Sequence, residues 1–251
     1  MKLSRRQSLK ALTAAVAWPS PGSVQAHSFR LIVLDVGGTI LEDRGDVVAA
    51  LQSAMAQRDI IISAAEIGPW RGASKRAVIQ HFVDQRSKSN DADRQTLAGE
   101  IYKSFVGHVN EAYRAVPPIA GAEEAIRKLR ENDYLVAATT GFDREIVMPI
   151  FRRLGWEKDF VAIVASDDVS EGRPAPYMIF RAMETARVNS VAEVMAVGDT
   201  VADLRAASNA GLRGVVGVLS GAGPAEQIRR EPHTHILSSV AKLPGLLVPK
   251  R

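Results

Sequence analysis

Residues 29 to 39 read Phe29-Arg30-Leu31-Ile32-Val33-Leu34-Asp35-Val36-Gly37-Gly38-Thr39. The part before Asp35 is a short aliphatic and β-branched run, which is typical of a buried strand, and the two glycines after it indicate a turn. A carboxylate at the carboxyl end of a strand can act as a nucleophile, bind a metal ion or cap a helix. This stretch therefore predicts one strand of a sheet with Asp35 at its end.

Four further apolar runs of the same kind follow, at residues 134–138, 160–165, 194–197 and 214–219, and a helical pattern separates each run from the next. Strands that alternate with helices form right-handed βαβ units, in which helices cover both faces of a parallel sheet. We therefore expect a Rossmann-like α/β core. Ligands of such a core bind at the carboxyl ends of its strands.

The long segment between the first two runs has no convincing strand pattern. Its apolar residues recur at helical spacing, for example at Leu51 and Met55. An insertion of this length with its own helices predicts an α-helical cap, and Pro117-Pro118 suits a hinge back to the core. We expect the cap at residues 47–116 and a core made of residues 29–46 and 117–251.

The composition limits the possible classes of function. The chain has 251 residues, of which 46% are hydrophobic, so it can form a sizeable core. The formal charge of +4 comes from the basic residues of the first 26, because the remainder carries 28 basic and 28 acidic residues. Nothing therefore favours a nucleic-acid-binding surface. The absence of cysteine excludes disulfides, thiolate catalysis and cysteine-based zinc sites.

The first 26 residues resemble an export leader. They contain a motif similar to the twin-arginine signal, Ser4-Arg5-Arg6-Gln7-Ser8-Leu9-Lys10, then an apolar run at 11–18, then a cleavage pattern at Val24-Gln25-Ala26. We expect a signal peptide at 1–26 and a periplasmic protein. The alternative is a disordered extension or a wrongly assigned start on a cytoplasmic protein. The apolar run is too short to span a bilayer, so we expect no stable membrane anchoring.

Three other polar segments follow predicted strands. Asp199 and Asp203 supply carboxylates that can bind a hard cation, and Thr139-Thr140-Gly141 offers hydroxyls and amides to a phosphoryl oxygen. Arg173 adds a fixed cation. Taken singly, the two aspartates can be helix caps, the first threonine an ordinary strand-end residue, and the arginine a surface charge. Three carboxylates at one sheet edge, however, repel one another unless a cation joins them.

The order of these groups resembles the four-motif signature of the haloacid dehalogenase superfamily, and the match extends from Asp35 to about residue 222. The resemblance implies that Asp35 attacks phosphorus and forms an aspartyl-phosphate. It implies a Mg²⁺ cofactor held by Asp35, the backbone carbonyl of Gly37, Asp199 and Asp203. It assigns the phosphoryl oxygens to Thr139, Thr140 and Arg173. The further substrate-binding positions that we predict are Gly38, Arg71, Gly72 and Gly141.

Gly37 departs from the pattern of most of this superfamily. Phosphatases and mutases of the superfamily carry a second aspartate two residues after the nucleophile, and this aspartate protonates the leaving oxygen. No carboxylate can act from Gly37, which weakens the interpretation as a phosphate monoesterase. Two branches of the superfamily do without this acid, namely the phosphonatases and the haloacid dehalogenases.

Segments 139–145, 166–174 and 197–203 resemble the phosphonatase branch. In that branch a cap lysine forms a Schiff base with an aldehyde substrate, and Lys75 matches it in Arg71-Gly72-Ala73-Ser74-Lys75. An iminium can accept the electrons of a broken carbon–phosphorus bond, and it does so without an acid on oxygen. Lys75 must be desolvated to act as an amine near neutral pH.

Three positions of this chain depart from the phosphonatases. Val78 replaces a histidine, Phe142 replaces a tyrosine, and Arg71 replaces a methionine. The alternative for Lys75 is a cap residue that only binds the substrate's anion or lies in solvent. These departures put phosphonoacetaldehyde itself in doubt as the substrate.

The sequence therefore predicts a Mg²⁺-dependent hydrolase that cleaves the carbon–phosphorus bond of a small phosphonate. One alternative is a phosphatase or mutase that acts on a small phosphate monoester. Others are a dehalogenase, which needs no Mg²⁺, and a non-catalytic relative that only binds metal. The resemblance also implies a homodimer, although no interface pattern in the sequence shows one.

Several other residues have ordinary interpretations. The alternation of His233 and His235 would place both rings on one face of a strand, as in a metal site. No third ligand is evident nearby in the sequence, so we expect a loop-to-strand junction instead. Trp70 lies near the predicted cap loop and can shape a pocket. Asp167 and Asp168 are expected to position the loop that follows them rather than to bind metal.

Overall fold

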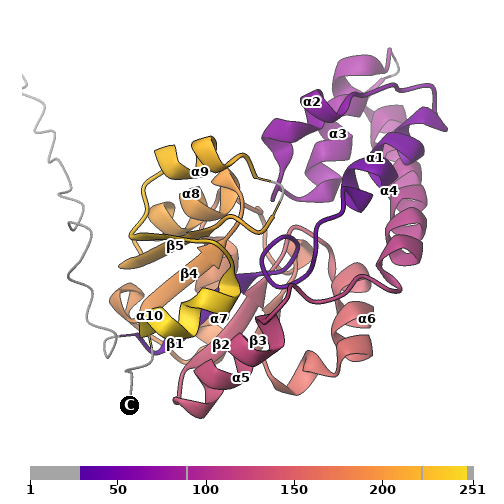
Figure 1. The fold of residues 1–251 in the computed structure, drawn as a ribbon. Helices are drawn as coiled ribbons and strands as arrows, with labels where there is room; N and C mark the ends of the chain where they lie inside the picture. Colours follow the sequence, from indigo (N-terminus) through magenta and orange to yellow (C-terminus); the bar gives the residue numbers. More distant parts are fainter. Residues whose placement is uncertain (1–28, 89, 222, 248–251) are drawn as a thin grey trace, which may run out of the picture.

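The computed structural model describes residues 29–88, 90–221 and 223–247. Its strands are β1 (Leu31–Asp35), β2 (Leu135–Thr139), β3 (Ala162–Val164), β4 (Val194–Gly198), β5 (Gly214–Val218) and β6 (His235–Leu237). They form one parallel sheet in the order β3-β2-β1-β4-β5-β6 (Figure 1). The expected Rossmann-like α/β core is thereby confirmed. The predicted leader, residues 1–26, lies outside the described residues.

β1 lies at the centre of the sheet, between β2 and β4. All of its residues are buried, because hydrophobic layers cover both faces. Ile32 and Leu34 pack into one layer, and Leu31 and Val33 into the other. The register places Asp35, the last residue of β1, beside the last residue of β2. The carboxyl ends of the central strands therefore meet at one edge of the sheet.

The core helices are α5 (Ala122–Glu131), α6 (Arg144–Leu154), α7 (Tyr177–Ala186), α8 (Val201–Asn209), α9 (Ala225–Arg230) and α10 (Leu243–Leu247). Short 3-10 helices are η3 (Trp156–Lys158), η4 (Ser166–Asp168), η5 (Val191–Glu193) and η6 (Val240–Lys242). Ile126 of α5 and Leu243 of α10 pack in one layer, whereas Met178 of α7 and Leu204 of α8 pack in the other. The sheet is thus covered on both faces, as predicted.

The sequence pattern does not predict β6. This strand has only three residues, and all three are partly exposed, so it leaves too short a periodic signal. The loop-to-strand junction expected at residues 233–235 coincides with its start.

The segment between β1 and β2 is helical, as expected. Its helices are α1 (Asp46–Ala56), α2 (Ala64–Ile67), η2 (Gly68–Trp70), α3 (Lys75–Arg86) and α4 (Asp91–Tyr113), and we call this group the cap. α1 and α3 both pack along α4, and the cap stands apart from the sheet at the upper right of Figure 1. Asn90 caps α4 by accepting a hydrogen bond from the Asp93 amide at 3.0 Å. The division of the chain at residues 46 and 117 remains our prediction.

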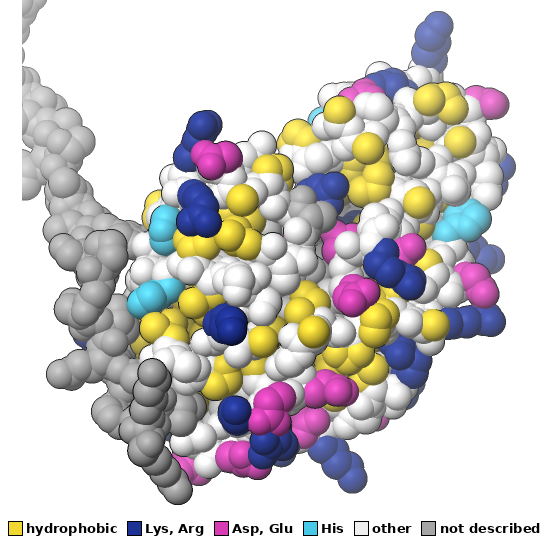
Figure 2. All heavy atoms as spheres, in the orientation of Figure 1, with side chains coloured by type: hydrophobic (Ala, Val, Ile, Leu, Met, Phe, Trp, Pro, Cys, Tyr) yellow, Lys and Arg dark blue, Asp and Glu magenta, His cyan; other side chains and the backbone are white. Residues whose placement is uncertain are grey.

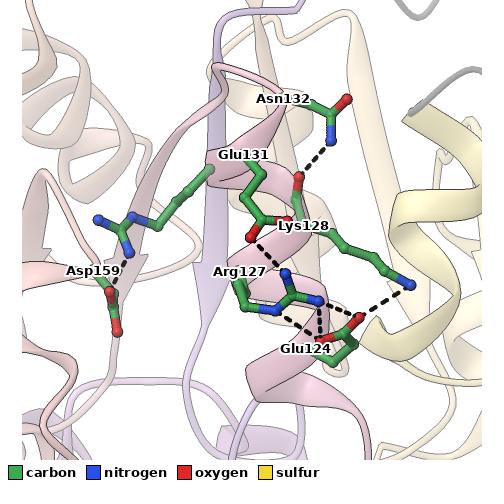
Figure 3. Close-up of polar contacts among 7 residues, drawn as sticks. Glu124, Arg127, Lys128, Glu131, Asn132 and Asp159 are labelled. Atoms are coloured by element: carbon green, nitrogen blue, oxygen red, sulfur yellow. Dashed lines mark hydrogen bonds and ion pairs between the residues drawn. The ribbon is translucent and has the colours of Figure 1, made fainter.

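Charged side chains of both signs are interspersed on the face shown in Figure 2. One such group lies along α5, where Arg127 pairs with Glu124 and Glu131, and Lys128 lies 3.1 Å from Glu124 (Figure 3). These pairs at helical spacing support α5 and keep its outer face solvated. Among the described residues, none of the helices combines the length and the hydrophobicity that a bilayer span requires.

Candidate active site

Asp35, the predicted nucleophile, ends β1 and has only 6% of its surface exposed. Its Oδ1 accepts a hydrogen bond of 2.6 Å from Nη1 of Arg173. Burial, followed by the negative charge of Asp203, raises the pKa of Asp35 to about 6, and the charge of Arg173 opposes this rise. A fixed cation thus holds the carboxylate in one orientation.

Arg173 joins three of the predicted site residues. Besides Asp35, its Nη1 lies 2.5 Å from Oδ1 of Asp203, and its Nη2 donates to Oγ1 of Thr139 at 2.9 Å. The side chain is buried, so the alternative of a surface charge is wrong. A buried guanidinium requires such partners, because an unpaired buried charge is strongly destabilising.

Asp199 follows β4 directly and is almost fully buried. The Thr39 hydroxyl donates to its Oδ1 at 3.3 Å. Burial, followed by the charge of Asp35, raises the pKa of Asp199 well above its ordinary value. Carboxylate oxygens of Asp35, Asp199 and Asp203 all lie within 4.8 Å of one another. Such a cluster of oxygen donors suits a hard divalent cation, which also removes the repulsion between the acids.

The turn after β1 carries Gly37, which lines the same cavity as Asp35 and Asp199. The Gly38 amide donates to the Leu41 carbonyl at 2.7 Å, and the Leu41 amide donates to the Val36 carbonyl at 2.9 Å. No donor within the described part of the chain reaches the Gly37 carbonyl, which leaves it available to a cation. Gly38 has φ +83°, and a Cβ there would lie 2.4 Å from Oδ2 of Asp199. Only glycine therefore lets the turn approach the acids so closely.

Asp203 has partners on both of its oxygens. Oδ2 accepts hydrogen bonds from the Thr200 amide at 3.0 Å and the Thr200 hydroxyl at 2.5 Å, within a capping box that begins α8. Oδ1 contacts Arg173. The helix-cap alternative is thus correct for Asp203, alongside its place in the acidic cluster. This arrangement suits a residue that holds the arginine more than one that contacts a metal directly.

Lys75 is the first residue of α3 and has 7% of its surface exposed. Its Nζ donates to the Ala73 carbonyl at 2.6 Å and lies 5.8 Å from the centre of the Phe142 ring. Burial, followed by the positive charge of Arg173, lowers the pKa of Lys75 to about 8, whereas Asp35 opposes the shift. The alternative that Lys75 lies in solvent is wrong. The amine is desolvated, as a Schiff-base lysine requires.

A cavity of about 80 Å³ lies between the cap and the core, and both parts line it. Its core side contains Asp35, Gly37, Asp43, Thr140, Gly141, Phe142, Arg173, Asp199 and Thr200. Its cap side contains Val47, Val48, Leu51, Ile67, Trp70, Arg71, Gly72, Lys75, Val78 and Tyr113. The predicted nucleophile and the predicted amine therefore open into one cavity with an apolar wall.

Two predicted glycines allow the cap to touch the core at this cavity. A Cβ at Gly141 would lie 2.6 Å from the Ala73 carbonyl oxygen, so the loop before Lys75 rests directly on the loop after β2. Gly72 has φ +80°, and a Cβ there would lie 2.5 Å from Oγ1 of Thr200. Side chains at either position would push the cap away from the acids. These glycines thus allow the close contact between the cap and the core.

Arg71, which we predict to bind substrate, lies 3.6 Å from Oδ2 of Asp43. Four polar residues of the site were not predicted from the sequence, namely Thr39, Asp43, Tyr113 and Thr200. Thr39 directly follows the glycine pair, so its place could have been inferred from the turn. Tyr113 has no such signal, because only the packing of α4 brings it to the cavity.

Trp70 lines the cavity, as its place near the cap loop suggested, whereas the other residues with ordinary interpretations lie elsewhere. Among the described residues, the acidic cluster is the one group of this kind found, and neither histidine of 233–235 belongs to it. Asp167 accepts a hydrogen bond from the Arg144 amide at 2.8 Å, and Asp168 pairs with the Arg144 side chain. The two acids hold the η4 turn against the start of α6, as expected.

The family model described as haloacid dehalogenase-like hydrolase matches residues 29–211. The chain belongs to this family of hydrolases, and the resemblance seen in the sequence is confirmed. A phosphonoacetaldehyde hydrolase from Lactiplantibacillus plantarum is 30% identical over 259 residues, a match that covers 88% of this chain and 96% of the relative.

A bifunctional phosphonoacetaldehyde hydrolase/aminoethylphosphonate transaminase from Clostridioides difficile is 35% identical over 117 residues. That match covers 45% of this chain but only 18% of the longer relative. A solved structure of a phosphonoacetaldehyde hydrolase-like protein from Oleispira antarctica has a TM-score of 0.76 at 19% identity, over 91% of this chain and 95% of the other. This last likeness shows the fold alone.

Proposed function

We propose that this chain is a Mg²⁺-dependent hydrolase that cleaves the carbon–phosphorus bond of a small phosphonate carrying an aldehyde. The observation that carries the proposal is the buried amine of Lys75, whose pKa is lowered to about 8, in one cavity with Asp35. Position 37 of the same cavity has no acid. The phosphonoacetaldehyde hydrolases similar to this chain support the same reaction.

On the phosphoryl side, Asp35 is the nucleophile. One of its carboxylate oxygens attacks phosphorus, and the resulting aspartyl-phosphate is hydrolysed by water to phosphate and free carboxylate. Arg173 and Thr140 line the cavity and are assigned to the phosphoryl oxygens, and the Thr139 hydroxyl, which does not line it, accepts a hydrogen bond from Arg173. In this role Arg173 exchanges part of its contact with Asp35 for contact with substrate.

Asp35, Asp199 and the Gly37 carbonyl are the groups that hold Mg²⁺, with Asp203 behind them. When bound, the ion neutralises charge on the phosphoryl oxygens and removes the repulsion between the carboxylates. The donors are all oxygens, and their spacing fits such an ion.

On the carbon side, the Lys75 amine adds to the aldehyde carbon and expels its oxygen as water, which leaves an iminium. As Asp35 attacks phosphorus, the electron pair of the carbon–phosphorus bond moves into the iminium and gives an enamine. Protonation at carbon and hydrolysis then release the aldehyde product and restore the amine. The lysine iminium thus accepts the electrons of the broken carbon–phosphorus bond. The reaction therefore needs no acid at position 37 to protonate a leaving oxygen.

A second candidate is a phosphatase for a small phosphate monoester. The space at Gly37 favours this candidate, because a Cβ at position 37 would have the Tyr113 hydroxyl, at 3.9 Å, as its nearest neighbour. A water molecule in this space can protonate the leaving oxygen. The clustered carboxylates argue against a dehalogenase, which needs no cation. Export through the leader at 1–26 remains our prediction.

The test compares phosphate release from phosphonoacetaldehyde and from a panel of phosphate monoesters, with Mg²⁺ present. The proposal predicts faster release from the phosphonate, and loss of that activity alone in Lys75→Arg, which keeps the charge but cannot form an imine. Release from monoesters at a rate that Lys75→Arg leaves unchanged would instead favour the phosphatase.

A further inference from the structure

Tyr113 lies where two parts of the site meet, although it belongs to the cap. It is the last residue of α4, and only 3% of its surface is exposed. It lines the same cavity as Asp35 and Lys75. Its hydroxyl lies 3.9 Å from the position that a Cβ on Gly37 would take. The end of α4 thus brings a phenol to the turn that follows the nucleophile.

The ring of Tyr113 is fixed beside the amine. It packs edge-on against Phe142, with ring centres 5.4 Å apart and planes at 85°. The Lys75 Nζ lies 5.8 Å from the centre of that same Phe142 ring. The amine and the phenol are therefore both neighbours of the Phe142 ring, and both side chains line the same cavity.

The hydroxyl of Tyr113 is also uncommitted, unlike other polar groups of the cavity. Lys75 donates to the Ala73 carbonyl, Arg173 is shared between acids and Thr139, and the Thr140 hydroxyl accepts from the Phe142 amide at 3.1 Å. Within residues 29–88, 90–221 and 223–247, no hydrogen bond to the Tyr113 hydroxyl is found. Because Tyr113 lines the cavity and its hydroxyl oxygen is not among the fully buried unpaired atoms, the hydroxyl is free to donate to a ligand bound there.

The charge state of Tyr113 limits what it can do. Burial, followed by the negative charges of Asp43, Asp46 and Asp35, raises the pKa of Tyr113 above its ordinary value. The phenol therefore stays protonated at neutral pH and donates a hydrogen bond, but it is a poor source of protons.

We infer that the Tyr113 hydroxyl donates a hydrogen bond to the aldehyde oxygen of the substrate while Lys75 adds to the adjoining carbon. The inference rests on the proposed function and names a further residue for it. As the amine adds, the π electrons of the carbonyl move to its oxygen. That oxygen leaves as water with one proton from the amine and one from solvent, whereas Tyr113 keeps its own. The hydrogen bond stabilises the charge that builds on the oxygen.

The test uses Tyr113→Phe with Tyr177→Phe as the control. Tyr177 is an exposed tyrosine that begins α7, and it does not line the cavity. Borohydride traps the imine of phosphonoacetaldehyde with Lys75, and mass spectrometry follows the rate of adduct formation. We expect Tyr113→Phe to slow this rate roughly tenfold, which corresponds to about 1.4 kcal/mol and is typical of one hydrogen bond. Tyr177→Phe should stay within about twofold of the unaltered chain.

The outcomes separate this role from the proposed function. If the unaltered chain forms the adduct and Tyr113→Phe forms it at the same rate, the role of Tyr113 is wrong and the proposed function stands. If the unaltered chain forms no adduct and releases no phosphate from the phosphonate, both are wrong. A Tyr113→Phe variant with a normal thermal midpoint and a slowed adduct supports the role, because a merely structural tyrosine would leave trapping unchanged.

Discussion

Lys75 keeps an amine inside the protein at a cost in stability. Burial lowers its pKa from 10.5 to about 8, so folding disfavours the charged form wherever the unfolded chain is protonated. Below pH 8 both states carry the proton and the full penalty applies. As pH rises through 8 to 10.5, the penalty disappears.

We therefore predict that Lys75→Met stabilises the protein at pH 7 by at most about 3 kcal/mol and abolishes imine formation. The gain should shrink as pH rises toward 10. Urea unfolding of both proteins at several pH values measures this difference. A variant that is less stable at pH 7 would show that the amine is held by favourable contacts rather than merely desolvated.

The adjoining glycines 37 and 38 have different structural requirements. Gly38 has φ +83° and lies against Asp199, so Gly38→Ala should lose about 1–3 kcal/mol and weaken Mg²⁺ binding. Gly37 has neither constraint, and Gly37→Ala should stay within about 1 kcal/mol of the parent. Urea unfolding and Mg²⁺ titration of the pair provide the measurement. Equal losses at the two positions would contradict this account of the turn.

Position 37 also distinguishes the two candidate reactions. Gly37→Asp introduces a carboxylate where a built Cβ has open space, so the variant should fold. If poor protonation of a leaving oxygen limits a weak monoesterase activity, this variant should raise kcat for monoesters by about tenfold or more. The carbon–phosphorus cleavage step should gain nothing, because carbon and not oxygen leaves phosphorus in that step. An equal rise in kcat for phosphonate and monoester would contradict this distinction between the two reactions.

At the scale of elements, α3 and α4 hold the cap against the start of α6. Arg76 of α3 forms an ion pair with the buried Asp143, which precedes α6, and it also stacks on Tyr102 of α4 at 3.7 Å. A pair that joins cap and core favours the closed cavity, in which water is excluded from Lys75.

Arg76→Met should therefore raise KM roughly tenfold, because it leaves a buried carboxylate without its ionic partner when the cap closes. Its control is Arg86→Met at the other end of α3, which breaks an exposed ion pair with Glu66 inside the cap. Steady-state kinetics should show a KM change in the first variant alone. Equal kinetics for both variants would mean that the Arg76 contact does not govern closure.

Much at this scale could be predicted from the sequence. Five strands have aliphatic runs long enough to detect, and Asp35, Thr139 and Asp199 lie at the ends of three of them, so a parallel topology suffices to bring these residues together. β6 could not be found, because three half-buried residues carry no period. Tyr113 and the ion pair of Arg76 with Asp143 could not be found either, since both depend on how the cap packs on the core.

At the scale of the whole molecule, the acidic cluster couples metal binding to stability. Without a cation the three carboxylates repel one another, so Mg²⁺ should stabilise the protein by about 2.7 kcal/mol at a hundredfold excess over its Kd. Asp199→Asn should abolish this gain without destabilising the metal-free protein, because it removes one of the repelling charges. Glu171→Gln, at an exposed acid, is the control. The midpoint of thermal unfolding, measured with Mg²⁺ and with EDTA, gives the stabilisation of each variant by the ion. If Mg²⁺ stabilised Asp199→Asn as much as the parent chain, the assigned metal site would be contradicted.

The predicted homodimer and the predicted export leader also belong to this scale. Both remain predictions. The residues that we assign to the proposed reaction all line or adjoin the cavity between cap and core.

In the proposed reaction, Lys75 forms an imine with the substrate while Asp35 accepts the phosphoryl group. The most direct test is borohydride reduction of the protein with phosphonoacetaldehyde and Mg²⁺, followed by mass spectrometry of the digested chain. The account predicts a reduced adduct on the peptide that contains Lys75, loss of phosphate release in step with its formation, and no adduct in Lys75→Arg. Phosphate release from the phosphonate with an unmodified Lys75 would contradict it.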